Sequence, residues 1–334
     1  MVNLVLDNPP GRDHRFNVGD DIQVVAAERL MPRVDGIVQK ERISLYEGAP
    51  AKMILNGWFM HSPQYWPPPP AIDPLFVSIH INPAAADRML DEAGQAYIRE
   101  RQPVGARDME TLEILRSRGI DAYFSGCLTL TLDKSQFAPG NASRAGIVIA
   151  DPLYKISPAA GLRATLSRAK RGRLFAGARF KKIEADFLSK VIPQRLRGQP
   201  TTRTYHSLTL PVMDYEARRA QAIRLLEVYA NAELVITSRI HCALPCLAFG
   251  TPVIFVNCGL EKETESARLK GLLEFFHVIS FDAKSGIVLW PDSLDGFRKD
   301  GRLTNKDLHV PYRDALRARC REFLEAPVQM RSGN

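Results

Sequence analysis

The stretch Glu233–Val256 constrains the fold most, because it predicts a complete strand–helix–strand unit. A short apolar run, Leu234–Ile236, has the length expected of a buried parallel strand. The next two residues, Thr237 and Ser238, offer hydroxyls that can cap a following helix. That helix ends at a Gly-Thr-Pro triplet, and Val253–Val256 predicts the next strand. We therefore expect an α/β protein built on parallel strands.

Arg239 and His241 stand in the first turn of the predicted helix. The unpaired N–H groups and the positive dipole end of a helix N-terminus favour an anion at that place. A guanidinium and a titratable imidazole there would form an anion-handling site with an acid or a base attached. The structural alternative is a surface arginine and a half-buried histidine that only stabilise the helix start.

Three motifs occur in a characteristic order along most of the chain. Asn17–Asp20 has the form N-x-G-D, and Gly105–Asp108 runs into Thr111 in the form R-D-x-x-T. Ser238–His241 is followed by a helix of small residues and by Gly250–Pro252. Together the three motifs resemble the polysaccharide pyruvyl transferase family, and their order is more specific than any one of them.

The resemblance implies two Rossmann-like, doubly wound α/β domains in a GT-B-like arrangement with an interdomain cleft. It implies a transferase that moves the enolpyruvyl unit of phosphoenolpyruvate onto two hydroxyls of a sugar. The product would be a pyruvate ketal in the biosynthesis of a surface polysaccharide (an exopolysaccharide) or a glycolipid. Phosphoenolpyruvate is then a co-substrate, and we expect no cofactor. No G-x-G-x-x-G fingerprint, P-loop or metal-ligand spacing occurs, so we expect no metal.

The donor is a small polyanion, so its site needs several cations or helix N-termini. We expect the guanidinium groups of Arg239 and Arg107 to bind its carboxylate and phosphate as bidentate forks. His241 is expected to transfer protons, either as an acid toward the methylene group or as a base for a hydroxyl. Beside these three catalytic candidates, the predicted donor site includes Ser238, Ile240, Asn17, Gly19 and Asp20. The alternative for Asp20 is a plain helix cap.

The chain of 334 residues suits two domains of ordinary size. Residues 1–137 are predicted to form the acceptor-side domain and residues 145–310 the donor-side domain. A polar segment with Pro139 and Gly140 reads as the linker between them. Residues 311–326 form a terminal helix that we expect to return to the first domain. Within the second domain, Glu261–Phe276 is predicted to be helical.

Acceptor binding is predicted for an aromatic loop, Asn56–Ala71, whose four consecutive prolines would hold it above the sheet edge. Aromatic rings can stack on the apolar face of a sugar. His80 is a further candidate for acceptor binding, because it lies at the carboxyl end of the predicted strand Leu75–Ile81. The structural alternatives are a packed loop and a core histidine. The predicted acceptor residues are Asn56, Trp58, His61, Trp66 and His80.

Positive charge is concentrated in residues 163–203, which hold twelve Lys or Arg against two acidic residues, whereas the whole chain has a net charge of +8. This basic segment is expected either to be a solvated face or to contact anionic lipid headgroups or a pyrophosphate-bearing acceptor. Few aromatic residues are interleaved with it, which argues against nucleic acid. The acceptor would then be either free or lipid-linked. The sequence leaves the oligomeric state open.

The five cysteines lack zinc-like spacing, no apolar run approaches the roughly 20 residues of a membrane span, and no signal-peptide pattern is present. We therefore expect a cytoplasmic protein, either free or peripheral at the inner face of a membrane. Two other functions fit the same fold. One is a GT-B glycosyltransferase with a nucleotide-sugar donor, and the other is a non-catalytic carbohydrate-binding subunit at the membrane face.

Overall fold

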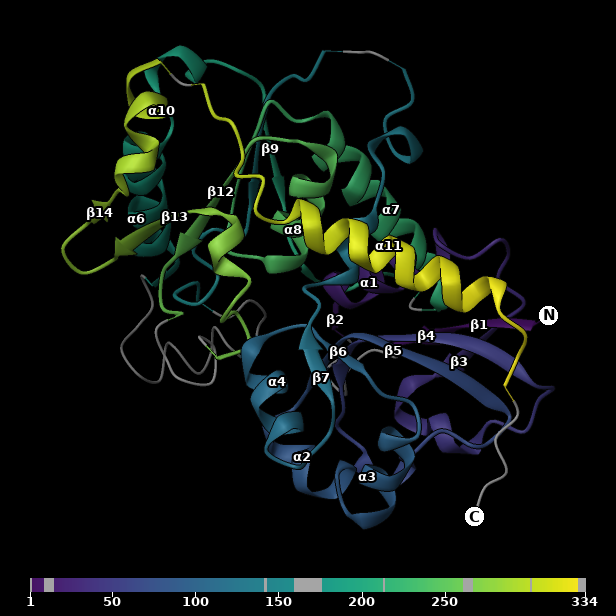
Figure 1. Cartoon of the computed structure of the whole chain (residues 1–334). Coiled ribbons are helices and arrows are strands. Elements are labelled where there is room, and N and C mark those ends of the chain that lie inside the picture. The colour runs from purple at the N-terminus through teal and green to yellow at the C-terminus, as the bar shows by residue number, and fades with distance from the viewer. Residues whose placement is uncertain are drawn as a thin grey trace.

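The computed structural model describes residues 2–8, 15–140, 143–158, 176–212, 214–260, 267–300 and 302–329. These residues contain two six-stranded sheets and a two-stranded ribbon between them (Figure 1). The predicted α/β fold with parallel strands is confirmed. None of the helices in the described residues is long and apolar enough to cross a membrane.

The first sheet is parallel throughout, with the strand order β3-β1-β4-β5-β6-β7. Its strands are β1 (Val2–Asp7), β3 (Gly36–Gln39), β4 (Ala51–Phe59), β5 (Ile72–Ile81), β6 (Val104–Ala106) and β7 (Ala122–Phe124). Its helices are α1 (Val18–Glu28), α2 (Pro83–Met89), α3 (Glu92–Arg99) and α4 (Met109–Arg116). The central strands are buried along nearly their whole length, as expected for parallel strands covered on both faces.

The second sheet has the order β14-β13-β12-β11-β8-β9 and is parallel except for its edge strand β14. Its strands are β8 (Ile147–Ala150), β9 (Thr201–Thr204), β11 (Leu234–Thr237), β12 (Val253–Asn257), β13 (His277–Asp282) and β14 (Ile287–Leu289). The helices of this half are α6 (Ala176–Val191), α7 (Tyr215–Asn231), α8 (Ile240–Phe249), α10 (Asp295–Asp300) and α11 (Val310–Glu325). The predicted strand–helix–strand unit is confirmed as β11-α8-β12.

Both faces of the second sheet are covered by apolar helices. Val235 and Phe255 pack in the same core as the buried residues of α7 and α8. Ile236, on the opposite face, belongs to a separate core with Phe187 of α6 and Phe297 of α10. Successive side chains of a strand point to opposite faces, so the continuous apolar runs of these strands fit burial on both sides.

The two halves are held together at several places. Helix α1 packs against α7 and α8, and one hydrophobic core runs through both halves. Strand β2 (Phe16–Asn17) pairs antiparallel with β10 (Ser207–Leu208) to form the ribbon. Figure 1 shows α11, in yellow, running from α8 toward the strands of the first sheet, where it contacts β5. The Lys52 ammonium donates to the carbonyl of Phe323 in this helix.

Two segments differ from the sequence prediction. Strand β4 extends through Phe59, so Asn56 and Trp58 lie on a strand and not in a loop. The reason is that β4 stays paired with β5 as far as Ile81, and Gly57 (φ 96°) absorbs a shift of register that resembles a turn in sequence. The helix predicted for Glu261–Phe276 is wrong in its described part. Residues 261–266 lie outside the described residues, and turns and a short 3-10 helix follow.

A buried ion cluster joins α7 to the first half. Arg218 of α7 contacts Asp7, at the end of β1, and Asp21 of α1. Burial raises the pKa of both carboxyl groups despite the guanidinium, and it raises that of Asp21 to about 7. The arginine therefore offsets the cost of two carboxylates that water cannot reach.

We expect Arg218→Ala to destabilise the fold by about 3–5 kcal/mol, because it leaves two buried carboxylates without a cation. The loss should be larger at about pH 8 than at about pH 5, where the carboxyl groups take up protons and lose their charge. Denaturant unfolding at both pH values measures it. Arg224→Ala, at an exposed position of the same helix, is the matched control and should change stability by less than about 0.5 kcal/mol.

Candidate functional site

A cavity of about 310 Å³ lies between the two halves, where strands of both sheets reach their carboxyl ends. Trp58 is the last residue but one of β4, Arg107 directly follows β6, and Ser238 directly follows β11. Ligand groups in open α/β sheets lie at this edge. The other lining residues are Asn17, Asp20, His61, Tyr154, His206, Arg239, Ile240, His241, Arg268 and Leu269.

The start of α8 differs in detail from the prediction. The N-cap residue is Arg239, and no side chain caps the helix. Thr237 Oγ1 accepts from the backbone N–H of Arg239 at 2.9 Å and donates to the carbonyl of Ala150 at 2.7 Å. The Ser238 hydroxyl lies against backbone carbonyls as well. The two hydroxyls thus connect the end of β11 to neighbouring backbone segments. The sequence pattern alone does not distinguish this role from that of a helix cap.

Arg239 is held by one carboxylate and one aromatic ring. Its Nε donates to Asp151 Oδ2 at 2.9 Å, and its guanidinium carbon lies 3.7 Å from the centre of the Tyr154 ring. Its Nη1 and Nη2 have no partner among the described residues and remain available to an anion. Asp151 also accepts from the backbone N–H of His206 at 2.9 Å. Its backbone is left-handed (φ 49°), which is uncommon for a residue other than glycine.

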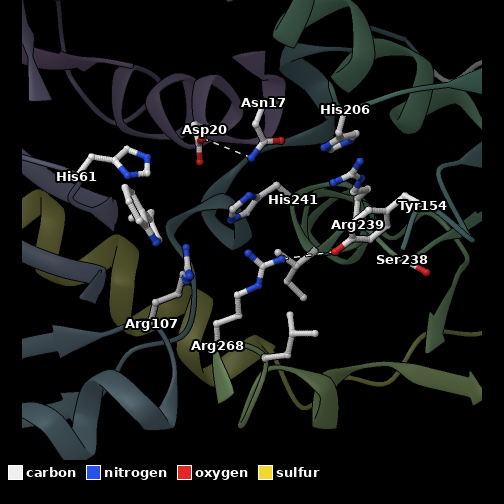
Figure 2. Close-up of a pocket in the computed structure, with 13 residues that line it drawn as sticks. Asn17, Asp20, His61, Arg107, Tyr154, His206, Ser238, Arg239, His241 and Arg268 are labelled. Carbon is white, nitrogen blue, oxygen red and sulfur yellow. Dashed lines mark hydrogen bonds between the residues drawn. The ribbon is translucent and has the colours of Figure 1, made fainter. Parts of the chain in front are cut away.

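His241 lies at the centre of the cavity wall (Figure 2). Its Nε2 is buried and has no hydrogen-bond partner in the described part of the chain. Burial lowers the pKa of the imidazole well below its usual value, and the positive charges of Arg107 and Arg268 lower it further, as do His206 and His80. The ring is therefore neutral near pH 7 in the absence of a ligand.

Gly19 brings the first turn of α1 against this imidazole. A Cβ atom at Gly19 would lie 2.8 Å from His241 Nδ1, closer than real Cβ contacts allow, and 3.2 Å from His241 Cβ, which is tighter than most such contacts. Asn17 is the N-cap of α1, and its Oδ1 accepts from the N–H of Gly19 at 3.3 Å. Asp20 lines the cavity and accepts from Gln23 Nε2 at 3.3 Å. The N-x-G-D motif therefore packs one half against the catalytic candidate of the other.

Arg107 reaches the cavity from the opposite side (Figure 2). Its Nε lies 3.4 Å from Asp108 Oδ2, and its Nη1 donates to Gln23 Oε1 at 3.4 Å. Asp108 is the N-cap of α4 and accepts from the N–H of Thr111 at 3.0 Å. Asp108 also accepts a 2.7 Å hydrogen bond from His80 Nδ1. A single buried carboxylate thus supports both Arg107 and His80.

Most of the predicted site residues line this cavity. Four of them are described by the structure but are not among its lining residues. Gly19 lies behind His241. Asn56 is buried and donates to the backbone carbonyl of Gln23 at 3.0 Å. Trp66 is buried among the rings of Phe59, Phe76 and Tyr97. His80 is buried beside Asp108. Trp58 and His61 line the cavity, with their ring centres 4.3 Å apart.

Sequence reasoning missed Tyr154, His206, Arg268 and Leu269. Tyr154 and His206 follow β8 and β9 within a few residues, and this position after a strand was the signal that could have found them. Arg268 was hidden inside the helix predicted for Glu261–Phe276. Its Nη2 lies 3.5 Å from the Tyr154 hydroxyl.

A possible metal cluster in the described residues has a simpler explanation. His80, Asp108 and Glu110 offer ligand atoms that all lie within 4.8 Å of one another. However, His80 Nδ1 and Asp108 Oδ2 already share a 2.7 Å hydrogen bond in a buried position. We assign this group to the support of Arg107 and propose no metal there.

Three guanidinium groups surround a neutral imidazole in a cavity between two parallel sheets (Figure 2). In this α/β protein, such an arrangement suits a small, multiply charged anion. The family model of polysaccharide pyruvyl transferases matches residues 17–259, and the chain belongs to that family. No curated protein matches the chain. Membership makes the protein a transferase of polysaccharide biosynthesis with a sugar or polysaccharide acceptor.

If His241 is catalytic, we expect Gly19→Ala to lower turnover at least about tenfold, because the added methyl group displaces the His241 ring. The same overpacking should destabilise the fold by about 1–3 kcal/mol. Turnover and denaturant unfolding measure the two effects. Gly296→Ala is the matched control, because a Cβ there meets no atom within 4 Å. Equal turnover of the two variants would contradict the role given to Gly19.

Proposed function

We propose that this protein transfers the enolpyruvyl unit of phosphoenolpyruvate onto two hydroxyls of a sugar, forming a pyruvate ketal and releasing phosphate. The observation that carries the proposal is the neutral imidazole of His241 among Arg107, Arg239 and Arg268. Its buried Nε2 has no hydrogen-bond partner among the residues that the structure describes. Phosphoenolpyruvate has a carboxylate and a phosphate at the two ends of a three-carbon unit. Guanidinium groups on opposite walls suit such an anion.

The donor itself would switch His241 into an acid. Burial and the neighbouring cations keep the imidazole neutral in the free protein. An anionic donor among these cations offsets their charge, so the pKa of His241 rises on donor binding and the ring can take up a proton. His241 Nε2 can then give this proton to the methylene carbon of the enol. Carbon C2 gains cationic character in this step and becomes open to attack by a hydroxyl oxygen.

Asp20 suits the acceptor better than the donor, because its carboxylate would repel the anion. We propose that Asp20 accepts the proton of the first attacking hydroxyl. The oxygen of that hydroxyl then forms a bond to C2. The bond between C2 and the phosphate oxygen then breaks, and its electron pair leaves with phosphate. The second hydroxyl forms the second C2–O bond, and its proton ends on the phosphate. Of the two hydroxyl protons, the net reaction leaves one on the new methyl group and one on inorganic phosphate.

The sugar acceptor would rest on Trp58 and on His61, and His61 lies across the cavity from Arg239 (Figure 2). The ammonium of Lys40 lies 5.3 Å from the centre of the Trp58 ring and helps to fix it. A fixed ring offers the apolar face of a sugar a stacking surface at little entropic cost. Because Asp20 lines the same cavity, a hydroxyl of this sugar and a carboxylate base can meet there.

The proposal also covers the domain arrangement of the enzyme, its location in the cell and the form of its acceptor. We place it in a GT-B-like arrangement, in the cytoplasm or at the inner face of a membrane, with an acceptor that is either free or lipid-linked. Of the basic segment 163–203, residues 163–175 lie outside the described residues. In the described part, Arg179, Lys181 and Lys182 are exposed on α6. These cations support electrostatic contact with anionic headgroups.

We expect His241→Ala to lower the rate of ketal formation about 10²–10⁴-fold, the usual contribution of a general acid or base. Arg239→Lys should also lower it, because lysine keeps the charge but cannot form a bidentate fork. Phosphate release from phosphoenolpyruvate, with mass analysis of the sugar product, measures both. Undiminished turnover by His241→Ala would sink the proposal. Thermal stabilisation by a nucleotide diphosphate, but not by phosphoenolpyruvate, would favour a glycosyltransferase.

A second prediction concerns the uptake of protons when phosphoenolpyruvate binds. Because the pKa of His241 lies well below its usual value in the free protein and rises on donor binding, phosphoenolpyruvate should bind with uptake of up to about one proton. Affinity should then increase as the pH falls from above the pKa of the complex toward that of the free protein. Calorimetry in buffers of different ionisation enthalpy measures the uptake. His241→Gln is the control, and an unchanged uptake in that variant would contradict the prediction.

A further inference from the structure

We propose that Tyr154 is a positioning residue of the anion site, which acts on the donor by holding Arg239 and Arg268 in place. The inference rests on the proposed function, because it gives Tyr154 a task in the binding of phosphoenolpyruvate. Tyr154 follows β8 and lies outside the three motifs that the sequence analysis singled out. Its side chain nevertheless lines the cavity between the two halves, beside Arg239 (Figure 2).

The ring of Tyr154 supports Arg239 without using any of its hydrogen-bond donors. The guanidinium carbon of Arg239 lies over this ring, 3.7 Å from its centre. The N–H donors of an arginine lie in the plane of its guanidinium group, so a ring on the face leaves all of them available. Asp151 then accepts from Nε alone, at 2.9 Å. The ring and the carboxylate together fix Arg239 and leave its Nη1 and Nη2 to an anion.

The hydroxyl end of the same side chain contacts a second arginine. Arg268 Nη2 lies 3.5 Å from the Tyr154 hydroxyl oxygen, which can accept a hydrogen bond from it (Figure 2). Tyr154 thus contacts two cations from separate segments, since Arg239 begins α8 and Arg268 comes after β12. The face of an aromatic ring and a phenol oxygen are both negatively polarised. One residue therefore offsets part of the repulsion between two guanidinium groups that must approach the same anion.

The place of the ring in the fold explains why an aromatic side chain is needed there. Tyr154 and Arg239 also line a second cavity, of about 790 Å³, and so form part of the wall between the two cavities. Without the ring, the guanidinium group of Arg239 could turn toward the second cavity and its water. A fixed group loses less entropy when it binds an anion than a mobile one does. Tyr154 should therefore contribute mainly to the affinity for the donor.

Two substitutions separate the ring from the hydroxyl. Tyr154→Leu removes both, and we expect the Kd and the KM for phosphoenolpyruvate to rise about tenfold, as for the loss of a partly desolvated cation–π contact. Tyr154→Phe keeps the ring, so both values should rise only about threefold. In both variants kcat should change less than about threefold, because His241 keeps its place against Gly19. Calorimetry measures donor binding, and phosphate release measures turnover.

A double-mutant cycle tests whether the hydroxyl acts through Arg268. If it does, Tyr154→Phe should have no further effect on the Kd for phosphoenolpyruvate once Arg268→Met is present. An effect of unchanged size in that background would assign the hydroxyl to a direct contact with the donor, and it would overturn the positioning role. Denaturant unfolding checks that every variant is folded. Should Tyr154→Leu fail to fold, the cycle with Tyr154→Phe carries the test.

Tyr97→Leu is the matched control. Tyr97 is also half-buried, and the guanidinium carbon of Arg101 lies 3.7 Å from the centre of its ring, but neither residue is among those that line the cavity. This variant should keep the donor affinity of the unmodified protein. The inference is overturned if Tyr154→Leu keeps that affinity, or if Tyr97→Leu loses it equally. Absence of a ketal product while the donor still binds would instead count against the proposed function and leave the role of Tyr154 standing.

Discussion

The close contact between the first turns of α1 and α8 is the constraint on which the site depends. Only a residue without a Cβ at Gly19 lets α1 come this near to His241. The contact places Asn17 and Asp20, from the first half, beside Arg239 and His241 from the second. The short ribbon of β2 and β10 and the shared hydrophobic core hold the same juncture. The cavity therefore exists because two helix starts meet, and neither sheet contains it alone.

The cavity also has positively charged walls. Two arginines on the cavity walls are paired with carboxylates, Arg239 with Asp151 and Arg107 with Asp108. Part of each guanidinium group still faces the cavity. Such second-layer carboxylates orient the cations without cancelling them in the cavity. Burial lowers the pKa of His241, and the neighbouring positive charges lower it further. In the proposed reaction, binding of the anionic donor would therefore be coupled to charging of the imidazole.

Local sequence carried much of this information. Each of the three motifs lies at a strand-to-helix junction, and such junctions have recognisable signals: an apolar run, a cap residue, then helical periodicity. Asp108 follows β6 and caps α4. Because strands of α/β sheets end at a common edge, placing Arg107 and Arg239 at such ends was enough to predict that they face one cavity.

What the sequence by itself determined was the fold class, the junctions and the residues that follow them. The tertiary structure alone decided which neighbouring side chains turn inward. Trp66 enters the core and Asn56 bonds to the backbone of α1, although both stand near Trp58, which lines the cavity. Tyr154 joins the site from a turn after β8, where its position after a strand is the only local signal. The reason is physical: caps and periodicity arise from interactions within a few residues, whereas the direction of a side chain in a loop is set by distant partners.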